Sequence, residues 1–155
     1  LLLYLIEKYY GRENAIWCSK VAEIEFDRMD QNQFVIFNGQ KEHTDKEIKK
    51  SQEYIEQHYS EKINIEELAE QATTSSRNFV RRFKKATKNT PIEYIQRVRI
   101  ENAKKKLESS TMNVLQVMLD SGYNDDKTFR TIFKRYAGLT PLEYRKKYNR
   151  EMAYA

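Results

Sequence analysis

The chain has little of the chemistry on which enzymes and metal proteins depend. Its 155 residues include one cysteine, two histidines and four glycines. A single cysteine, Cys18, excludes a disulfide within the chain and suits a reducing compartment. The sequence has no glycine-rich phosphate loop, no HExxH motif and no cysteine pair spaced for zinc. We therefore expect no catalytic residue, no metal and no cofactor, and we predict that the chain is not an enzyme.

Long apolar runs are also absent. No stretch has the roughly 20 consecutive apolar residues that a membrane span needs, and no secretory signal is visible. The start, Leu1 to Leu3, is too short for either and has no initiator Met, so we expect the sequence to be a piece of a longer protein. These absences predict a cytoplasmic protein with no membrane partner.

The charge is distributed unevenly along the chain. The whole sequence carries a formal charge of +5 at pH 7. Residues 1–45 hold 5 Lys/Arg against 8 Asp/Glu, whereas residues 46–155 hold 23 against 15. A basic part next to an acidic part indicates that only the basic part meets nucleic acid.

The strongest pattern is a stretch that occurs twice in the basic part. Residues 75–94 read SSRNFVRRFKKATKNTPIEY, and residues 125–144 read DDKTFRTIFKRYAGLTPLEY. Equivalent residues lie 50 positions apart, as in Phe79/Phe129, Phe83/Phe133, Lys84/Lys134, Thr90/Thr140, Pro91/Pro141, Glu93/Glu143 and Tyr94/Tyr144. The same offset extends upstream to Ile65/Leu115, Leu68/Met118, Ala69/Leu119 and Ala72/Gly122. Since a solenoid needs at least three repeats, two copies predict a tandem pair of small helical modules.

Each copy places apolar residues at helical spacing on one side of a basic helix. The expected core residues are Phe79, Phe83 and Ala86 in the first copy, and Phe129, Ile132, Phe133 and Tyr136 in the second. The opposite face of the first helix is basic, with no acidic residue between positions 77 and 88. Each basic helix follows a shorter apolar helix after a tight turn, at residues 72–75 and 122–125. This is the helix-turn-helix layout, whose second helix enters the DNA major groove.

With these residues the chain, from about Lys46 to Arg150, resembles the AraC/XylS class of bacterial transcription regulators. The matching residues are Ala69, Ala72, Ser75, Arg77, Phe79, Arg82 and Phe83, then Gly122, Tyr123, Asp125, Phe129, Phe133, Lys134, Gly138, Thr140, Pro141, Tyr144 and Arg145. The resemblance implies an all-α fold with helix-turn-helix units at about residues 64–88 and 113–137, joined by a long linker helix. It implies a sequence-specific DNA-binding transcription regulator that reads two adjacent major-groove sites with two recognition helices.

The first 45 residues are predicted to be a short helical and irregular segment. Apolar residues follow one face of a helix that ends at Gly11, and a second helix runs from about Asn14 to Glu25. The stretch Phe34 to Phe37 has strand-like composition.

The stretch from Leu3 to Asp45 resembles the C-terminal tail of a DJ-1/PfpI (class I glutamine-amidotransferase-like) domain. That resemblance implies a truncated tail and linker at residues 1–45, ahead of a DNA-binding domain at residues 46–150. The missing N-terminal domain is then a candidate site for homodimer formation by the full-length protein.

Four pairs at capping-box spacing mark helix starts, namely Thr44 with Glu47, Asn64 with Glu67, Thr90 with Glu93, and Thr140 with Glu143. The helix from Pro91 to about Ser109 is predicted to be the linker. Its expected inward residues are Tyr94, Ile95, Val98, Ala103 and Leu107, and its expected solvent-facing residues are Arg97, Arg99 and Lys104 to Lys106.

The length of the linker bears on how DNA is read. At roughly 1.5 Å per residue it is about 27 Å long, which places the recognition helices about one DNA turn, or about 34 Å, apart. A linker this stiff allows two outcomes: bent DNA with both helices in grooves, or one helix outside its groove.

The predicted DNA contacts follow from side-chain chemistry, because Arg fits guanine, Asn fits adenine, and cations bind phosphate. The predicted base-contacting residues are Arg77, Asn78, Val80 and Arg81 on the first helix, and Lys127, Arg130 and Thr131 on the second. The predicted phosphate-contacting residues are Arg82, Lys84, Lys85 and Lys134. Asp125 is expected to cap its helix. Asp126 either favours the positive helix end or reads cytosine.

Two other functions compete with DNA reading. The chain could serve as a helical protein-interaction module that binds an acidic partner, or as a regulatory appendage of an enzyme-like N-terminal domain. Specific duplex binding with a steep salt dependence would favour DNA recognition. RNA polymerase is a further candidate partner of a transcription regulator.

Overall fold

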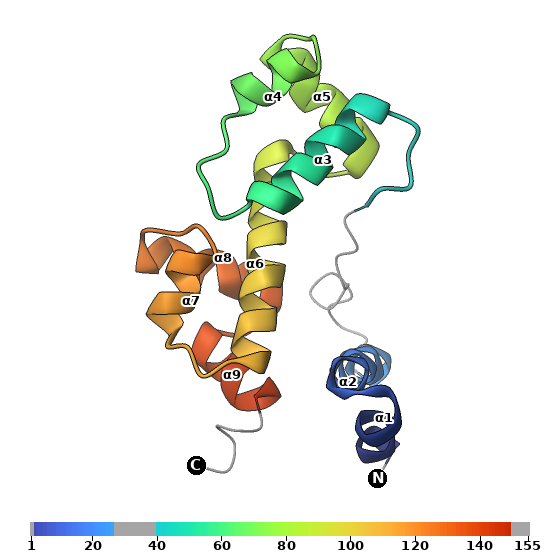
Figure 1. Cartoon of the computed structure of the whole chain (residues 1–155), viewed down its shortest axis with the longest axis vertical. Coiled ribbons are helices and arrows are strands. Elements are labelled where there is room, and N and C mark those ends of the chain that lie inside the picture. The colour runs from blue at the N-terminus through green and yellow to red at the C-terminus, as the bar shows by residue number, and fades with distance from the viewer. Residues whose placement is uncertain (1, 27–39, 150–155) are drawn as a thin grey trace. The chain divides into compact units, whose positions relative to one another are not determined.

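The computed structural model describes residues 2–26 and 40–149, and every regular element in these ranges is an α-helix (Figure 1). The helices are α1 Leu2–Tyr10, α2 Arg12–Phe26, α3 Lys46–His58, α4 Ile65–Gln71, α5 Ser76–Thr87, α6 Pro91–Ser109, α7 Val114–Asp120, α8 Asp126–Ala137 and α9 Pro141–Tyr148. The predicted all-α class is confirmed. The strand-like segment Phe34 to Phe37 lies outside the described residues. Within the described ranges, no helix combines the length and apolar character of a membrane span.

The described residues form two compact units, the first with α1 and α2 and the second with α3 to α9. In the first unit, Gly11 has φ +83° and ends α1, as predicted, because glycine adopts this backbone conformation without strain. The α2 helix begins at Arg12, two residues before the predicted start. The α1 helix has no buried residue, and its predicted apolar face is exposed, with Leu2 72% and Tyr9 70% accessible.

The second unit is organised around α6, which connects α3, α4 and α5 with α7, α8 and α9 (Figure 1). Its side chains contribute to two hydrophobic cores. The N-terminal half of α6 packs on α3, α4 and α5, which together we call the first module. The C-terminal half packs on α7, α8 and α9, which together we call the second module. The predicted linker helix and its inward residues are confirmed, and Ile100 is a further fully buried residue that the sequence analysis missed.

The two modules repeat the same aromatic packing. In the first module, the ring centroids of Phe79 and Phe83 are 5.7 Å apart, and Tyr94 stands edge-on to Phe83 at 5.4 Å. The equivalent distances in the second module are 5.7 Å for Phe129/Phe133 and 5.5 Å for Phe133/Tyr144. Each tyrosine hydroxyl donates to a glutamate, Glu56 or Glu108. The predicted core stripes of both basic helices are therefore confirmed.

The offset between the modules is 50 residues only from the recognition helices onward. Upstream of them, equivalent residues lie 49 positions apart. This offset relates the helix N-caps Asn64 and Asn113, and the buried pairs Leu68/Val117 and Ala69/Met118. It also relates the turn residues with positive φ, Thr73 at 52° and Gly122 at 81°. The backbone hydrogen bonds agree, since Thr74 N donates to Ala69 O and Tyr123 N to Met118 O. The turn of the second module is thus one residue longer, and Asn124 is the additional residue.

The upstream part of the predicted alignment was therefore wrong by one position. Leu115 and Leu119, the predicted counterparts of Ile65 and Ala69, are 58% and 46% exposed. The error arose because α7 has apolar residues at adjacent positions, so that either register puts an apolar residue opposite each core position of α4.

Most of the predicted helix starts are confirmed. Thr90 and Thr140 form complete capping boxes with Glu93 and Glu143, and Asn64 caps α4. The prediction for α3 was wrong, because its N-cap is Asp45, whose carboxylate accepts from Ile48 N at 3.3 Å. An aspartate serves at this position as well as a threonine does.

The predicted solvent exposure of the linker's basic residues was wrong for most of them. Arg99 donates to backbone carbonyls of the first module, and Arg97 lies 5.0 Å from the ring centroid of Tyr136. Lys104 pairs with Glu101 at 2.6 Å, and Lys106 donates to Asp120. Lys105 is exposed as predicted. Periodicity identifies the apolar face of a helix but not what its polar face meets, and here that face meets parts of both modules.

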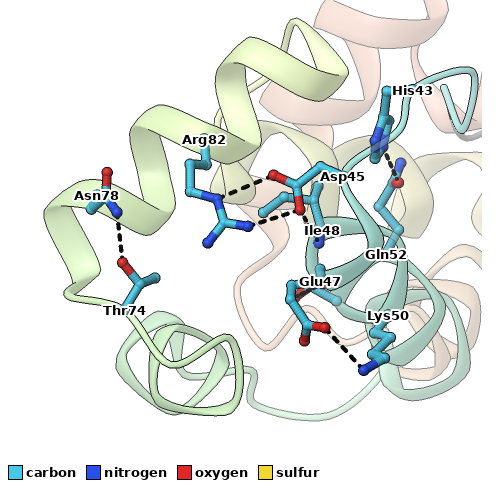
Figure 2. A network of polar contacts seen from close by, with 10 residues as sticks. His43, Asp45, Glu47, Ile48, Lys50, Gln52, Thr74, Asn78 and Arg82 are labelled. Atoms are coloured by element: carbon cyan, nitrogen blue, oxygen red, sulfur yellow. Dashed lines mark hydrogen bonds and ion pairs between the residues drawn. The ribbon is translucent and has the colours of Figure 1, made fainter.

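The segment from Gln40 to Asp45 docks on the first module. Gln40 O accepts from Gln52 at 3.4 Å, and the side chain of Gln40 accepts from Asn89. Lys41 pairs with Glu56 at 2.8 Å. His43 Nε2 lies 2.9 Å from Gln52 Oε1 (Figure 2). These contacts hold the backbone that leads into α3 against the core of the first module.

Candidate nucleic-acid interface

The recognition helix of the first module, α5, is oriented by its two phenylalanines. Its N-cap is Ser75, whose hydroxyl accepts from Asn78 N at 3.4 Å. Phe79 and Phe83 are fully buried, which turns the opposite face of the helix outward. That face carries the exposed side chains of Arg77, Arg81, Lys84, Lys85 and Lys88. Since no acidic residue lies within α5, this surface attracts a polyanion along its whole length.

Asn78 and Arg81 form a linked pair on α5. Asn78 Nδ2 donates to the hydroxyl of Thr74 at 2.7 Å (Figure 2). Arg81 Nη2 donates to Asn78 Oδ1 at 2.8 Å. These bonds fix which way the amide points. Each bond uses one amide hydrogen or one lone pair of Asn78 and leaves the other for a base, so both side chains are expected to act as a unit.

Arg82 has a different environment from its neighbours. Its Nε and Nη2 donate to the two carboxylate oxygens of Asp45 at 3.1 and 2.9 Å (Figure 2). Partial burial by itself would raise the pKa of Asp45, but the hydrogen bonds from Arg82 and Ile48 N outweigh it and hold this pKa below its ordinary value. The guanidinium therefore fastens α5 to the start of α3. The phosphate contact predicted for Arg82 remains a prediction.

The recognition helix of the second module, α8, presents a more mixed surface. Asp125 caps it, as predicted, by accepting from Thr128 N at 2.7 Å, and hydrogen bonds from the side chain and the backbone N–H of Thr128 lower the pKa of Asp125. The Nε of Arg130 lies 2.7 and 2.8 Å from the carboxylate oxygens of Asp126. The hydroxyl of Thr131 donates to Lys127 O at 2.8 Å. Lys127, Arg130, Thr131 and Lys134 are all exposed.

The two recognition helices therefore differ in charge. The first turn of α5 has no acidic residue, whereas the first turn of α8 contains Asp126. The ion pair of Asp126 with Arg130 offsets one of the cations of α8. The surface of α5 is accordingly the stronger site for a polyanion.

Reactive side chains do not gather in the part of the chain that the structure describes. No group of three or more His, Cys, Asp or Glu residues among these residues is placed to hold a metal ion. His43 bonds Gln52, and the ring of His58 stacks on Tyr54 at 4.3 Å.

The sequence analysis missed two residues that shape this interface. Asp45 lies 37 positions before Arg82, and no local pattern connects them. Thr74 lies four positions before Asn78, a spacing at which two polar side chains can form a local hydrogen bond. This spacing could have predicted the contact from the sequence.

Comparisons with known proteins agree with this geometry. The family description "Helix-turn-helix domain" matches residues 68–147, which is just over half of the chain. An uncharacterised HTH-type transcriptional regulator of Haemophilus influenzae is 39% identical over 83 residues, covering 54% of this chain and 28% of that protein. The bifunctional transcriptional activator/DNA repair enzyme AdaA of Bacillus subtilis is 34% identical over 102 residues, covering 66% of this chain and 48% of that protein.

A solved structure resembles the second unit. The DNA-binding domain of AdpA, a global transcriptional factor crystallised with a target DNA, superposes with a TM-score of 0.62 and 30% identity. The match covers 65% of this chain and 91% of that one. The chain thus spans most of the solved domain but only 28% and 48% of the two curated relatives.

Proposed function

The chain belongs to the helix-turn-helix domain family of AraC/XylS-type transcription regulators, and on this premise we propose that α5 and α8 read two adjacent major-groove sites. DNA binding for transcription regulation is the function of this domain. The observation that carries the two-site proposal is the placement of α5 and α8. Each is the second helix of a helix-turn-helix, and each holds exposed basic side chains away from its core. The likeness to a domain crystallised on its target DNA supports it.

We propose that the base contacts are made by the exposed or half-exposed side chains of both helices. These are Arg77, Asn78, Val80 and Arg81 on α5, and Lys127, Arg130 and Thr131 on α8. Lys84, Lys85 and Lys134 serve as phosphate contacts in this proposal. Arg82 is proposed as a further phosphate contact through the N–H groups that Asp45 does not use, while its bonds to Asp45 fix α5 to α3.

The experiment that tests this proposal is a selection of duplexes from a random DNA pool, followed by footprinting. We expect two boxes whose centres lie about 10 base pairs apart. Recovery of no preferred sequence would refute specific reading. Full affinity for a duplex with a scrambled second box would refute reading by α8 and leave α5 as the specific element.

We further propose that α1 and α2 belong to the tail of a DJ-1/PfpI-like domain, followed by a DNA-binding domain at residues 46–150. The exposed apolar side chains of the two helices support this, since Tyr10 is 74% and Trp17 is 52% accessible. Apolar surface of this kind usually meets another part of a protein. Homodimer formation through that domain would be tested by measuring the mass of the longer protein by light scattering.

We propose a regulator without catalytic activity, acting in the bacterial cytoplasm with RNA polymerase as a second partner. The relative AdaA is both an activator and a DNA repair enzyme, but the similarity covers 48% of it. Cys18 lies in α2, whereas His43 and His58 belong to the second unit and make structural contacts there. An electrophoretic assay of the regulator with RNA polymerase on an operator fragment would test the partnership.

A further inference from the structure

The two modules meet around Arg99, near the middle of α6. Its Nε donates to the carbonyl of Tyr59 at 2.7 Å, and its Nη2 donates to the carbonyl of Glu61 at 2.8 Å. Both carbonyls belong to the loop between α3 and α4, in the first module. The same guanidinium lies 5.4 Å from the ring centroid of Tyr123, in the turn of the second module. One side chain therefore contacts both modules.

Arginine suits this place for a physical reason. Tyr59 is the C-cap of α3, where helix carbonyls lack intrahelical partners and the helix dipole is negative. A charged donor makes a stronger hydrogen bond to such a carbonyl than a neutral donor does. The planar fork of Arg99 reaches two carbonyls at once, which a lysine ammonium on its flexible stem does not do with the same geometry.

Gly122 brings the backbones of the two modules into close approach. It has φ +81°, and a Cβ built on it would lie 2.9 Å from the carbonyl oxygens of both Tyr59 and Ser60. Since real Cβ atoms do not approach backbone this closely, any larger residue would push the loop away. The equivalent turn residue of the first module, Thr73, carries a side chain and is exposed. Since the same turn accommodates a threonine in the first module, it is the contact between modules that excludes a side chain at Gly122.

The contact continues to the second recognition helix. Tyr123 packs on Phe129 of α8, with ring centroids 5.3 Å apart. A rotation of the second module about α6 would therefore move Tyr123 off Arg99 and separate Gly122 from the loop.

We propose that Arg99 and Gly122 are positioning residues that fix the orientation of α8 relative to α5, and so determine which spacing between two DNA boxes the chain accepts. This inference rests on the proposed reading of two sites. One inserted base pair moves the second box by about 3.4 Å and rotates it by about 35°. A locked junction cannot follow that change, whereas a loosened junction can follow part of it.

The test uses the 155-residue chain and the duplex that it selects from a random pool. Further duplexes carry one base pair inserted or deleted between the boxes, or a scrambled second box. The variants are Arg99→Lys, which keeps the charge but loses the fork, and Gly122→Ala, which adds the Cβ. The matched control is Lys105→Ala, which alters an exposed residue of the same helix.

The readout is the ratio of affinities at the selected and altered spacings. The affinity of the wild type and of Lys105→Ala should fall about tenfold when the spacing changes, because the duplex must be deformed to fit. The affinity of Arg99→Lys and Gly122→Ala should fall by less than about threefold when the spacing changes. Both variants should bind the duplex with the scrambled second box with the same affinity as the wild type.

Two results would overturn the inference. One is that Arg99→Lys and Gly122→Ala both show the same ratio of affinities at the selected and altered spacings as the wild type. The other is an equal loss of affinity for every duplex together with loss of helix content, which would make the junction a requirement for folding alone. A wild type that is indifferent to the second box would instead refute the two-site proposal, and the inference with it.

Discussion

Asp45 and Arg82, 37 positions apart in the chain, form a two-point ion pair with nitrogen–oxygen distances of 2.9 and 3.1 Å. Asp45 also accepts from Ile48 N as the N-cap of α3. One carboxylate therefore starts α3 and holds the recognition helix α5 against it. The orientation of α5 depends on a residue outside the helix-turn-helix itself.

Substitution of Asp45 should separate its two roles. Asp45→Asn keeps a capping oxygen and removes the charge, so it should lower the free energy of unfolding by about 1 kcal/mol. Asp45→Ala removes both and should cost about 2 kcal/mol. Urea denaturation measures both values. Equal losses in the two variants would mean that the cap contributes little.

The contribution of the Asp45 charge should depend on pH. Because the folded-state pKa of Asp45 is lowered, its stabilisation is present above the unfolded value of about 3.9 and is lost as pH falls through the folded value. The difference in unfolding free energy between the wild type and Asp45→Asn should therefore shrink when the pH is lowered from 7 to below about 4. Denaturation curves at several pH values check this, and a constant difference would contradict it.

Arg81→Ala should lower affinity for the selected operator by about 1–3 kcal/mol and leave non-specific binding nearly unchanged. Because Arg81 bonds Asn78 directly, the double variant with Asn78→Ala should lose less than the sum of the two single losses. Fluorescence anisotropy with operator and random duplexes gives both quantities. Equal losses on operator and random DNA would identify Arg81 as a phosphate contact.

Lys85→Ala should weaken binding to all duplexes alike and reduce the magnitude of the salt slope by about one unit. The control is Lys50→Ala on α3, where the lysine pairs with Glu47 at 3.0 Å, and its slope should not change. Affinities measured over a range of salt concentrations provide the slopes. An unchanged slope for Lys85→Ala would remove this residue from the interface.

Lys88→Gly should stabilise the first module. Lys88 has φ +62°, a left-handed conformation, whereas the equivalent residue of the second module is Gly138 with φ +75°. Since a side chain costs about 1 kcal/mol in this conformation, the free energy of unfolding should rise by about that amount. The reciprocal change, Gly138→Ala, should lower it comparably. Thermal or urea unfolding tests both, and no gain from Lys88→Gly would show that its side chain compensates the strain.

Sequence patterns were sufficient to predict the recognition helices and the linker. Phe79 and Phe83 recur 50 positions later, and apolar residues at helical spacing predict which face of a helix packs inward when a core lies beside it. The Thr-Pro-x-Glu starts at Thr90 and Thr140 are equally local, because every atom of a capping box lies within one turn.

The residues that sequence patterns did not reveal act over long distances. Arg99 contacts carbonyls about 40 positions away, and its neighbours in sequence give no sign of them. The one-residue shift between the turns was hidden because α7 offers apolar residues in two registers. Amphipathic periodicity predicts which face of a helix is apolar. Contacts between residues that are distant in sequence depend instead on how the helices pack.

The docked segment from Gln40 to Asp45 gives the bound domain a polarity. Its contacts with Gln52, Glu56 and Asn89 keep it on the first module, so the polypeptide always enters the second unit at the end nearest α5. If α5 and α8 occupy boxes of different sequence, the operator is asymmetric and binds the domain in one orientation. Inverting it in a promoter would turn the second unit end for end, so that Gln40 lies towards the opposite flank of the site, while the DNA contacts themselves stay the same.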